Sequence, residues 1–237
     1  MAPQAAAIAS SKRRASPREI SHNLNGQRLG RKGRDTRVRI LAVAQEIIAE
    51  DAAATITLSE VARRAELRMA SLYVYFSDLS ELIEALLEPV MAEAEDSYLG
   101  VLRVRWADGE LAEKCAEFVS GFYRFWQRNA QILHLRNTLA DQKDVRMMRH
   151  RIESARPVIG LITGQMDHDP DLRRTAAVGM ATVLYMGFER AIAIATDRHF
   201  GEGMAEAFAP DVDHYLSAET RLFSFGISEF RTSSAAA

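Results

Sequence analysis

The 237-residue sequence has a single cysteine, Cys115, and no glycine-rich phosphate loop. One cysteine excludes an internal disulfide framework and any metal site built from several cysteines. The sequence also lacks a nucleophile elbow and a His-Glu-x-x-His motif, and its six histidines are scattered. These absences argue against an enzyme, and they predict no catalytic residue, no metal and no cofactor.

Long alternating runs of β-branched residues are also absent, whereas Ala, Leu, Glu and Arg are abundant. We therefore expect an all-α fold, and the 48% of apolar residues is enough for a buried core. The longest run without charge, residues 175–188, is too short to span a bilayer. The N-terminal charges are not followed by the apolar segment of a secretory signal, so we expect a cytoplasmic protein without a membrane partner.

The net charge of −2 is unevenly distributed along the chain. Residues 1–39 carry ten Lys or Arg against two acidic residues, whereas the remaining residues carry 20 basic and 30 acidic groups. This asymmetry predicts a basic arm for a polyanion, with a solubilising tail as the alternative. Residues 1–33 are rich in Ala, Ser, Gly and Arg without an apolar period, so they are predicted to be disordered.

Three amphipathic segments follow the arm. The first places apolar residues on one helical face and ends near Glu50. The sequences Thr-Leu-Ser-Glu at 57–60 and Asp-Leu-Ser-Glu at 78–81 are capping boxes, each of which opens a helix. A short helix over 68–75 is predicted between them. Two such short helices bury little apolar surface by themselves, so they need to pack against the first helix. This arrangement of three helices presents a helix to the major groove.

Residues 36–82 resemble the DNA-binding head of the TetR (tetracycline-repressor-like) family. The stretch 56–65, Ile-Thr-Leu-Ser-Glu-Val-Ala-Arg-Arg-Ala, is similar to the second helix of that family. The stretch 70–76, Ala-Ser-Leu-Tyr-Val-Tyr-Phe, is similar to its recognition helix and the aromatic residues that end it. The resemblance implies a helix-turn-helix domain over 34–82 and a helical ligand-binding and dimerisation domain over 83–237.

The sequence departs from the family pattern at three positions. Glu66-Leu67 replaces the usual Gly-Val of the turn, and because Glu66 lacks glycine's freedom at positive φ, a strained turn is predicted. Leu79 replaces a lysine that can meet a phosphate, and Ala52 replaces a glycine after the first helix. A weaker DNA affinity is expected, for which the basic arm would compensate.

The predicted DNA-binding residues belong to this head. Arg68 and Ser71 can reach base edges, since arginine is the best reader of guanine. The hydroxyls of Tyr73 and Tyr75 suit phosphate contacts that fix the register. The alternative interpretation, a plain core of a small helical domain, is preferred for Leu72 and Phe76. The full predicted set is Arg37, Thr57, Arg68, Met69, Ser71, Tyr73 and Tyr75.

Aromatic residues recur at helical spacing over 118–126. The resemblance implies a ligand pocket in this half of the chain, and such a pocket would favour an apolar or flat aromatic small-molecule effector. An ordinary core explains the same pattern. The candidate pocket residues are Phe118, Phe122, Phe125, Trp126, Met147, Tyr185 and Met186.

Beyond Gly109, helices are predicted over 110–129, 130–139, 144–166, 171–196 and 211–230. Residues 175–188 are apolar around the full circumference of a helix, so this helix must be covered on both sides. The last helix, over 211–230, supplies a second apolar stripe. Together they predict an isologous four-helix interface between two copies, which the resemblance also implies. A monomer with a central helix is the alternative.

The function that these features favour is a homodimeric repressor, which binds a palindromic operator in double-stranded DNA and is released by a small molecule. The alternative is a small-molecule-binding or scaffold helical protein with weakened DNA affinity, which Glu66 and Leu79 favour. A helical-bundle enzyme, the third possibility, would need a bound metal or cofactor.

Overall fold

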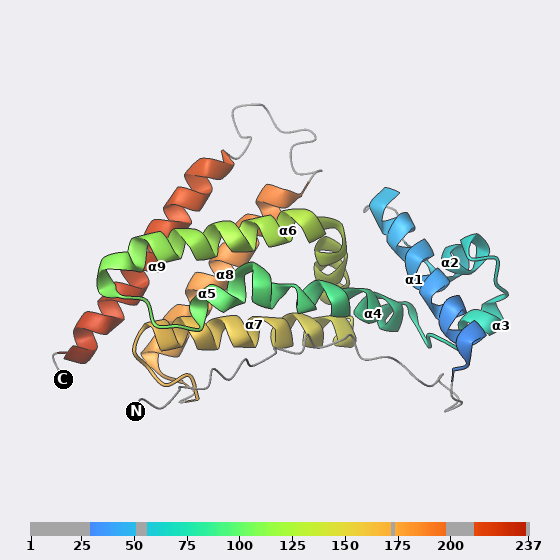
Figure 1. The fold of residues 1–237 in the computed structure, drawn as a ribbon, viewed down its shortest axis with the longest axis horizontal. Coiled ribbons are helices and arrows are strands. Elements are labelled where there is room, and N and C mark those ends of the chain that lie inside the picture. The colour runs from blue at the N-terminus through green and yellow to red at the C-terminus, as the bar shows by residue number, and fades with distance from the viewer. Residues whose placement is uncertain (1–28, 51–55, 172–173, 198–210, 236–237) are drawn as a thin grey trace, which may run out of the picture.

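Every regular element of the computed structural model is a helix within the residues it describes, 29–50, 56–171, 174–197 and 211–235. The predicted all-α fold is confirmed. A head of three helices lies at one end of the molecule: α1 (Arg31–Glu50), α2 (Leu58–Arg64) and α3 (Met69–Leu72). The helix α4 (Leu79–Ala92) leads from the head into the larger helical body (Figure 1).

The helix α1 begins at Arg31, whereas residues 1–33 were predicted to be disordered. The first turn exposes polar side chains, so no apolar period marks it. Leu29 is nevertheless buried, and its carbonyl accepts a hydrogen bond from Arg34 Nη1 at 3.0 Å. The boundary at residue 33 is therefore too late, and residues 1–28 of the predicted arm lie outside the described residues.

The predicted capping residues open their helices, but the reciprocal half of each box differs. Thr57 Oγ1 accepts from the amide of Glu60 at 3.2 Å, and Asp78 Oδ1 accepts from the amide of Glu81 at 2.7 Å. The Glu81 carboxylate accepts from the amide of Ser77 rather than from that of Asp78. The Glu60 carboxylate accepts hydrogen bonds from Arg63 and Arg64 instead.

The turn between α2 and α3 holds Glu66 at φ 53°, in the left-handed region that favours glycine. The positive φ expected at the position of the missing glycine is confirmed. The following helix is shorter than the predicted 68–75, because Tyr73 to Tyr75 leave the α-helical pattern. Leu72 and Phe76 are fully buried, as preferred for them from the sequence.

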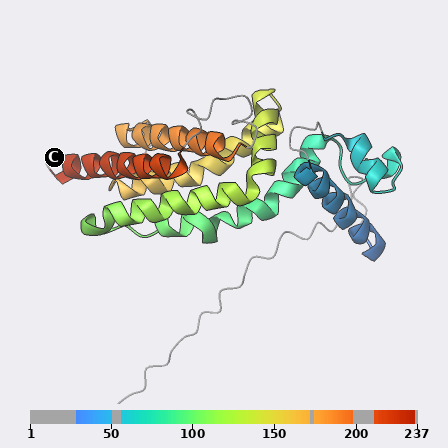
Figure 2. The ribbon, with the colours of Figure 1, turned by 90° about the horizontal axis from the view of Figure 1, so that it is seen from above.

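The body contains four long segments. After α4, a π-helical turn (Glu95–Leu99) and the short α5 (Gly100–Leu102) precede a 3-10 turn, Asp108–Glu110. The long α6 (Leu111–Asp141) packs against α7 (Val145–Gln165), α8 (Ala176–Thr196) and α9 (Val212–Ala235). Figure 2 shows α8 and α9 side by side at one side of the body.

Two predicted helix ends in the body were wrong by about one turn. The helix predicted from Asp171 begins at Ala176, because Thr175 caps it by accepting from the amide of Val178. The last helix continues past Phe230 to Ala235. The predicted division at Asn129 is a break within α6, where Asn129 has φ −116° and ψ 17°.

Among the described helices, α8 alone is long and apolar enough to cross a membrane, with a mean hydropathy of 1.3. It contains Glu189 and Arg190, and its inner face, which includes Ala181, Leu184 and Phe188, is buried. Helices α7, α6 and α9 contact it. The body therefore buries one face of α8.

Candidate nucleic-acid interface

The short helix α3 exposes one side and buries the other. Leu72 is fully buried in the head core, whereas Arg68 and Ser71 are exposed and Tyr73 is 49% exposed. Arg68 stands at the N-cap of α3 and makes no side-chain capping bond. The helix therefore offers a guanidinium and two hydroxyls on a surface that the head itself does not use.

The two arginines at the end of α2 are engaged with acidic neighbours. Arg63 forms a two-bond pair with Glu60, at 2.8 and 2.6 Å, and Arg64 Nε donates to the same carboxylate at 2.7 Å. Arg64 also reaches Glu50 on α1 at 2.6 Å. These hydrogen bonds lower the pKa of Glu60 to about 2, so the carboxylate stays charged at neutral pH. It offsets part of the positive charge of the two arginines at the end of α2.

The remaining predicted DNA-binding residues divide into two groups. Thr57 is exposed, but its hydroxyl oxygen lies 2.9 Å from Ser59 Oγ, in hydrogen-bond contact, and accepts from the Glu60 amide at the helix cap. Arg37 is half-buried, with its guanidinium carbon 5.2 Å from the centre of the Phe76 ring, and burial lowers its pKa. Met69 and Tyr75 pack against the head core. Of the seven predicted residues, Arg68, Ser71, Tyr73 and Thr57 are exposed.

Basic residues of α1 add to the head surface. Arg31, Lys32, Arg34 and Arg39 are exposed, and the first two lie in the segment that was predicted to be disordered. Arg31 and Lys32 were missed as helical residues because an apolar period is the signal of a buried face, and their side chains lie outside it.

The predicted aromatic stripe is a single buried cluster in the body. Phe118, Phe122, Phe125 and Trp126 are each at most 2% exposed, and Tyr185 of α8 joins them with its ring 5.9 Å from that of Phe122. Three further rings complete the cluster, and the sequence reasoning did not include them: Tyr98, Phe188 and Phe223.

The two methionines predicted for the pocket lie in different places. Met147 is fully buried in the core. Met186 is 62% exposed on the outer face of α8, so its assignment to the interior was wrong. It was grouped with Tyr185 because the two are neighbours in sequence, but consecutive residues on a helix point in different directions.

A buried ion pair lies beside the aromatic cluster. Arg136 is 3% exposed, and its Nη2 lies 2.9 Å from Glu189 Oε1 and 2.9 Å from Asn137 Oδ1. The guanidinium also lies 5.9 Å from the Trp126 ring. Burial raises the pKa of Tyr98 and Tyr185, which the charges of this pair also influence. The sequence reasoning did not single out Arg136 or Glu189, because nothing local marks an arginine as buried.

The outer faces of α8 and α9 carry large apolar side chains in the open. A Cβ on Gly226 would lie 2.8 Å from Leu184 Cδ1, so the two helices are in close contact. Both helices of this contact carry exposed apolar residues. The exposed fractions are 69% for Val183, 62% for Met186, 46% for Tyr215, 50% for Leu222 and 64% for Phe225.

Polar contacts join the start of α4 to the start of α7. Ser80 Oγ donates to Asp144, the residue that caps α7. Arg146 reaches the helix cap Asp78 at 3.4 Å and Glu84 at 3.2 Å. The helix that follows the head is thus held directly by the body.

No family model and no curated protein matches this sequence. A solved structure, that of a TetR family transcription regulator from Marinobacter aquaeolei VT8, is similar in fold with a TM-score of 0.51. The similarity covers 83% of this chain and 98% of that one, at 15% sequence identity. The chain has the fold of a TetR family transcription regulator, as the resemblance in the head implied.

Proposed function

On the premise of this fold, we propose that the protein is a DNA-binding transcriptional regulator, and that it represses by binding as a homodimer to a palindromic operator. The observation that carries the proposal is the exposed side of α3. Arg68, Ser71 and Tyr73 are presented to solvent on a helix whose other side is anchored by Leu72. Arginine and hydroxyl groups on a rigid helix suit base and phosphate contacts in the major groove.

The dimer is supported by the outer faces of α8 and α9. Each of these two helices, which are in close contact, carries exposed apolar side chains, and a second copy would cover them in a twofold arrangement. The head lies at the far end of the molecule from the C-terminal end of α9 (Figure 1). Two heads in such a dimer would meet half-sites about 34–36 Å apart, or a multiple of that spacing.

Release by a small molecule is supported by the aromatic cluster and the Arg136–Glu189 pair. Rings surround this region on several sides, and the ion pair supplies polar groups within the same core. A flat, mostly apolar effector with one polar end fits that chemistry. We place the protein with its DNA in the cytoplasm.

Selection from a library of random duplexes tests the proposal without knowledge of the operator. The full chain should enrich sequences with twofold symmetry. The bound fraction should fall as salt increases, because phosphate contacts release counterions. Enrichment of sequences without symmetry, or no enrichment at low salt, would contradict it.

One observation favours a helical scaffold or ligand-binding protein with weakened DNA affinity. Glu60 is paired with both Arg63 and Arg64, and Leu79 stands where a phosphate-binding lysine was expected. Replacing Glu60 with Gln removes the carboxylate charge that both arginines share, while Arg64 keeps its ion pair with Glu50. A variant that binds duplex DNA when the natural chain does not would support this second function.

A further inference from the structure

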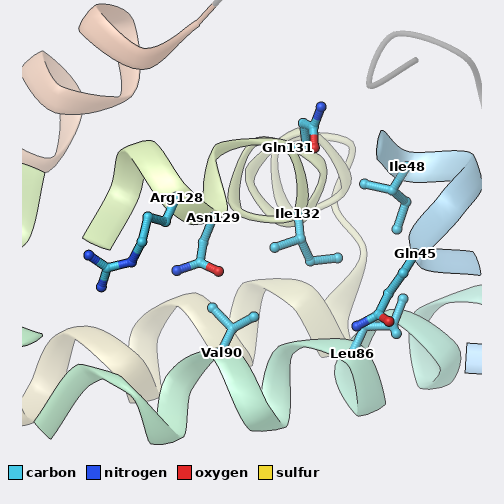
Figure 3. Close-up of a pocket in the computed structure, with 8 residues that line it drawn as sticks. All are labelled: Gln45, Ile48, Leu86, Val90, Arg128, Asn129, Gln131 and Ile132. Atoms are coloured by element: carbon cyan, nitrogen blue, oxygen red, sulfur yellow. The ribbon is translucent and has the colours of Figure 1, made fainter. Parts of the chain in front are cut away.

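A cavity of about 220 Å³ lies where α1, α4 and α6 meet (Figure 3). Its walls come from the head, from the helix that leaves the head, and from the break in α6. It shares no lining residue with the aromatic cluster or with the exposed side of α3. The lining residues are Gln45, Ile48, Leu86, Val90, Arg128, Asn129, Gln131 and Ile132.

The break in α6 directs this part of the helix toward the head. Figure 3 shows the helix changing direction next to Asn129, whose backbone is not helical. Asn129 Nδ2 donates to the Phe125 carbonyl at 3.0 Å, which provides that carbonyl with a partner near the break. Gln131 Nε2 donates to the Ala49 carbonyl at 3.1 Å, near the end of α1. Two of the polar side chains of the wall, Asn129 and Gln131, are therefore held in place by backbone groups.

The cavity is lined by four apolar and four polar side chains, and the exposed Arg128 forms its cationic end. Ile48 and Leu86 are buried, and Val90 and Ile132 are half-buried. In Figure 3, Arg128 lies at one end and Gln45 at the other. Arg128 Nη2 donates to Ser97 Oγ, a neutral acceptor, at 3.1 Å. Among the described residues, no carboxylate lies within ion-pair distance of this guanidinium, whereas Arg136 of the same helix is paired with Glu189.

We propose that this cavity binds a compact arylalkanoic acid, with the carboxylate on Arg128 and the ring against the apolar lining. An arginine presents a planar fork that matches a carboxylate. A cavity of about 150 Å³ accommodates benzene, so 220 Å³ holds one ring together with a short acidic arm. Gln45 provides an amide at the end of the cavity opposite Arg128.

Occupation of this cavity would regulate the head. Gln45 and Ile48 belong to the head, and Arg128 and Ile132 belong to the body, so a ligand that contacts both stabilises the arrangement seen here. This site is additional to the effector region in the aromatic cluster. Its existence does not depend on DNA binding, because the ligand contacts only the protein.

Calorimetric titration of the full chain with phenylacetate, in the absence of DNA, tests the site. We expect one saturable event, with a dissociation constant of about 1 mM or lower. Phenylacetamide, which has nearly the same shape without the charge, should bind at least tenfold more weakly. Arg128→Gln should weaken phenylacetate binding at least tenfold, and Val90→Phe, which fills the cavity, should abolish it.

Arg124→Gln is the matched control, because Arg124 is exposed one turn earlier on α6 and does not line the cavity. It should leave phenylacetate binding unchanged. Equal binding of phenylacetate and phenylacetamide would overturn the proposal, as would unchanged binding by both Arg128→Gln and Val90→Phe. Equal losses from Arg124→Gln and Arg128→Gln would also overturn it. Far-ultraviolet circular dichroism confirms that each variant is folded.

Discussion

Replacing Val183 with Glu should dissociate the proposed dimer. Val183 is 69% exposed on the outer face of α8, where the second copy is expected to cover it. Full burial of a valine contributes about 1.5 kcal/mol, so the exposed part contributes about 1 kcal/mol in each copy. The twofold axis doubles this to about 2 kcal/mol per dimer.

The introduced carboxylate adds a larger effect. Each glutamate would be buried without a partner, at a cost of at least about 1–3 kcal/mol per copy. The sum is about 4–8 kcal/mol, which corresponds to an increase of roughly 10³-fold or more in the dimer dissociation constant. Sedimentation equilibrium over the micromolar range measures this constant directly.

Val145→Glu is the control for this prediction. Val145 is also 69% exposed, but it lies at the first residue of α7, away from the α8 and α9 faces. An acidic residue at a helix N-terminus is favourable, so the variant should fold and remain dimeric. A monomeric natural chain at all concentrations would refute the reasoning, and so would equal dissociation of both variants.

Three further predictions concern stability, each measured by urea unfolding. Glu66→Gly should raise the free energy of unfolding by about 1 kcal/mol, because Glu66 has a positive φ. The control Glu88→Gly, in α4, should lower it by about 1 kcal/mol. A lower free energy of unfolding in both variants would contradict the strain at Glu66. Glu189→Ala should lower the free energy of unfolding by about 3–5 kcal/mol, because it leaves Arg136 buried without its carboxylate. The control Glu117→Ala breaks an exposed pair with Lys114 and should lower it by less than about 1 kcal/mol. Equal losses in the two variants would contradict this prediction. Burial lowers the pKa of His134 and His150 from 6.5, so the unfolded chain takes up protons first and stability is lost as pH falls below about 6.5. Replacing both histidines with Gln should flatten the decline between about pH 7.5 and 5.5, and an unchanged slope would exclude them as its cause.

The elements that could be predicted from the sequence are those with a local cause. The caps at Thr57 and Asp78 depend on residues three positions apart, and the strain at Glu66 depends on one missing glycine. The break at Asn129 was also predicted. The start of α1 was placed too late, because exposed polar turns have no apolar period.

Features that depend on contacts between distant residues could not be predicted in this way. The Arg136–Glu189 pair joins residues 53 positions apart, and nothing near either residue reveals the other. The cavity at Arg128 exists only because α1, α4 and α6 meet. The engagement of Arg63 and Arg64 by Glu60 was within local reach, but the capping-box pattern assigned Glu60 to the helix cap instead.

The affinity of Arg68→Ala for the selected palindrome tests the central claim most directly. If α3 reads the operator, the loss of one base contact in each head should cost about 2–6 kcal/mol per dimer, a decrease of roughly 30-fold or more. Binding to an unrelated duplex should fall much less, and Arg149→Ala, which removes an exposed arginine of α7, should bind like the natural chain. Fluorescence anisotropy at fixed salt measures all three. An Arg68→Ala chain that binds the palindrome as tightly as the natural chain would contradict the assignment of α3 as the DNA-reading helix.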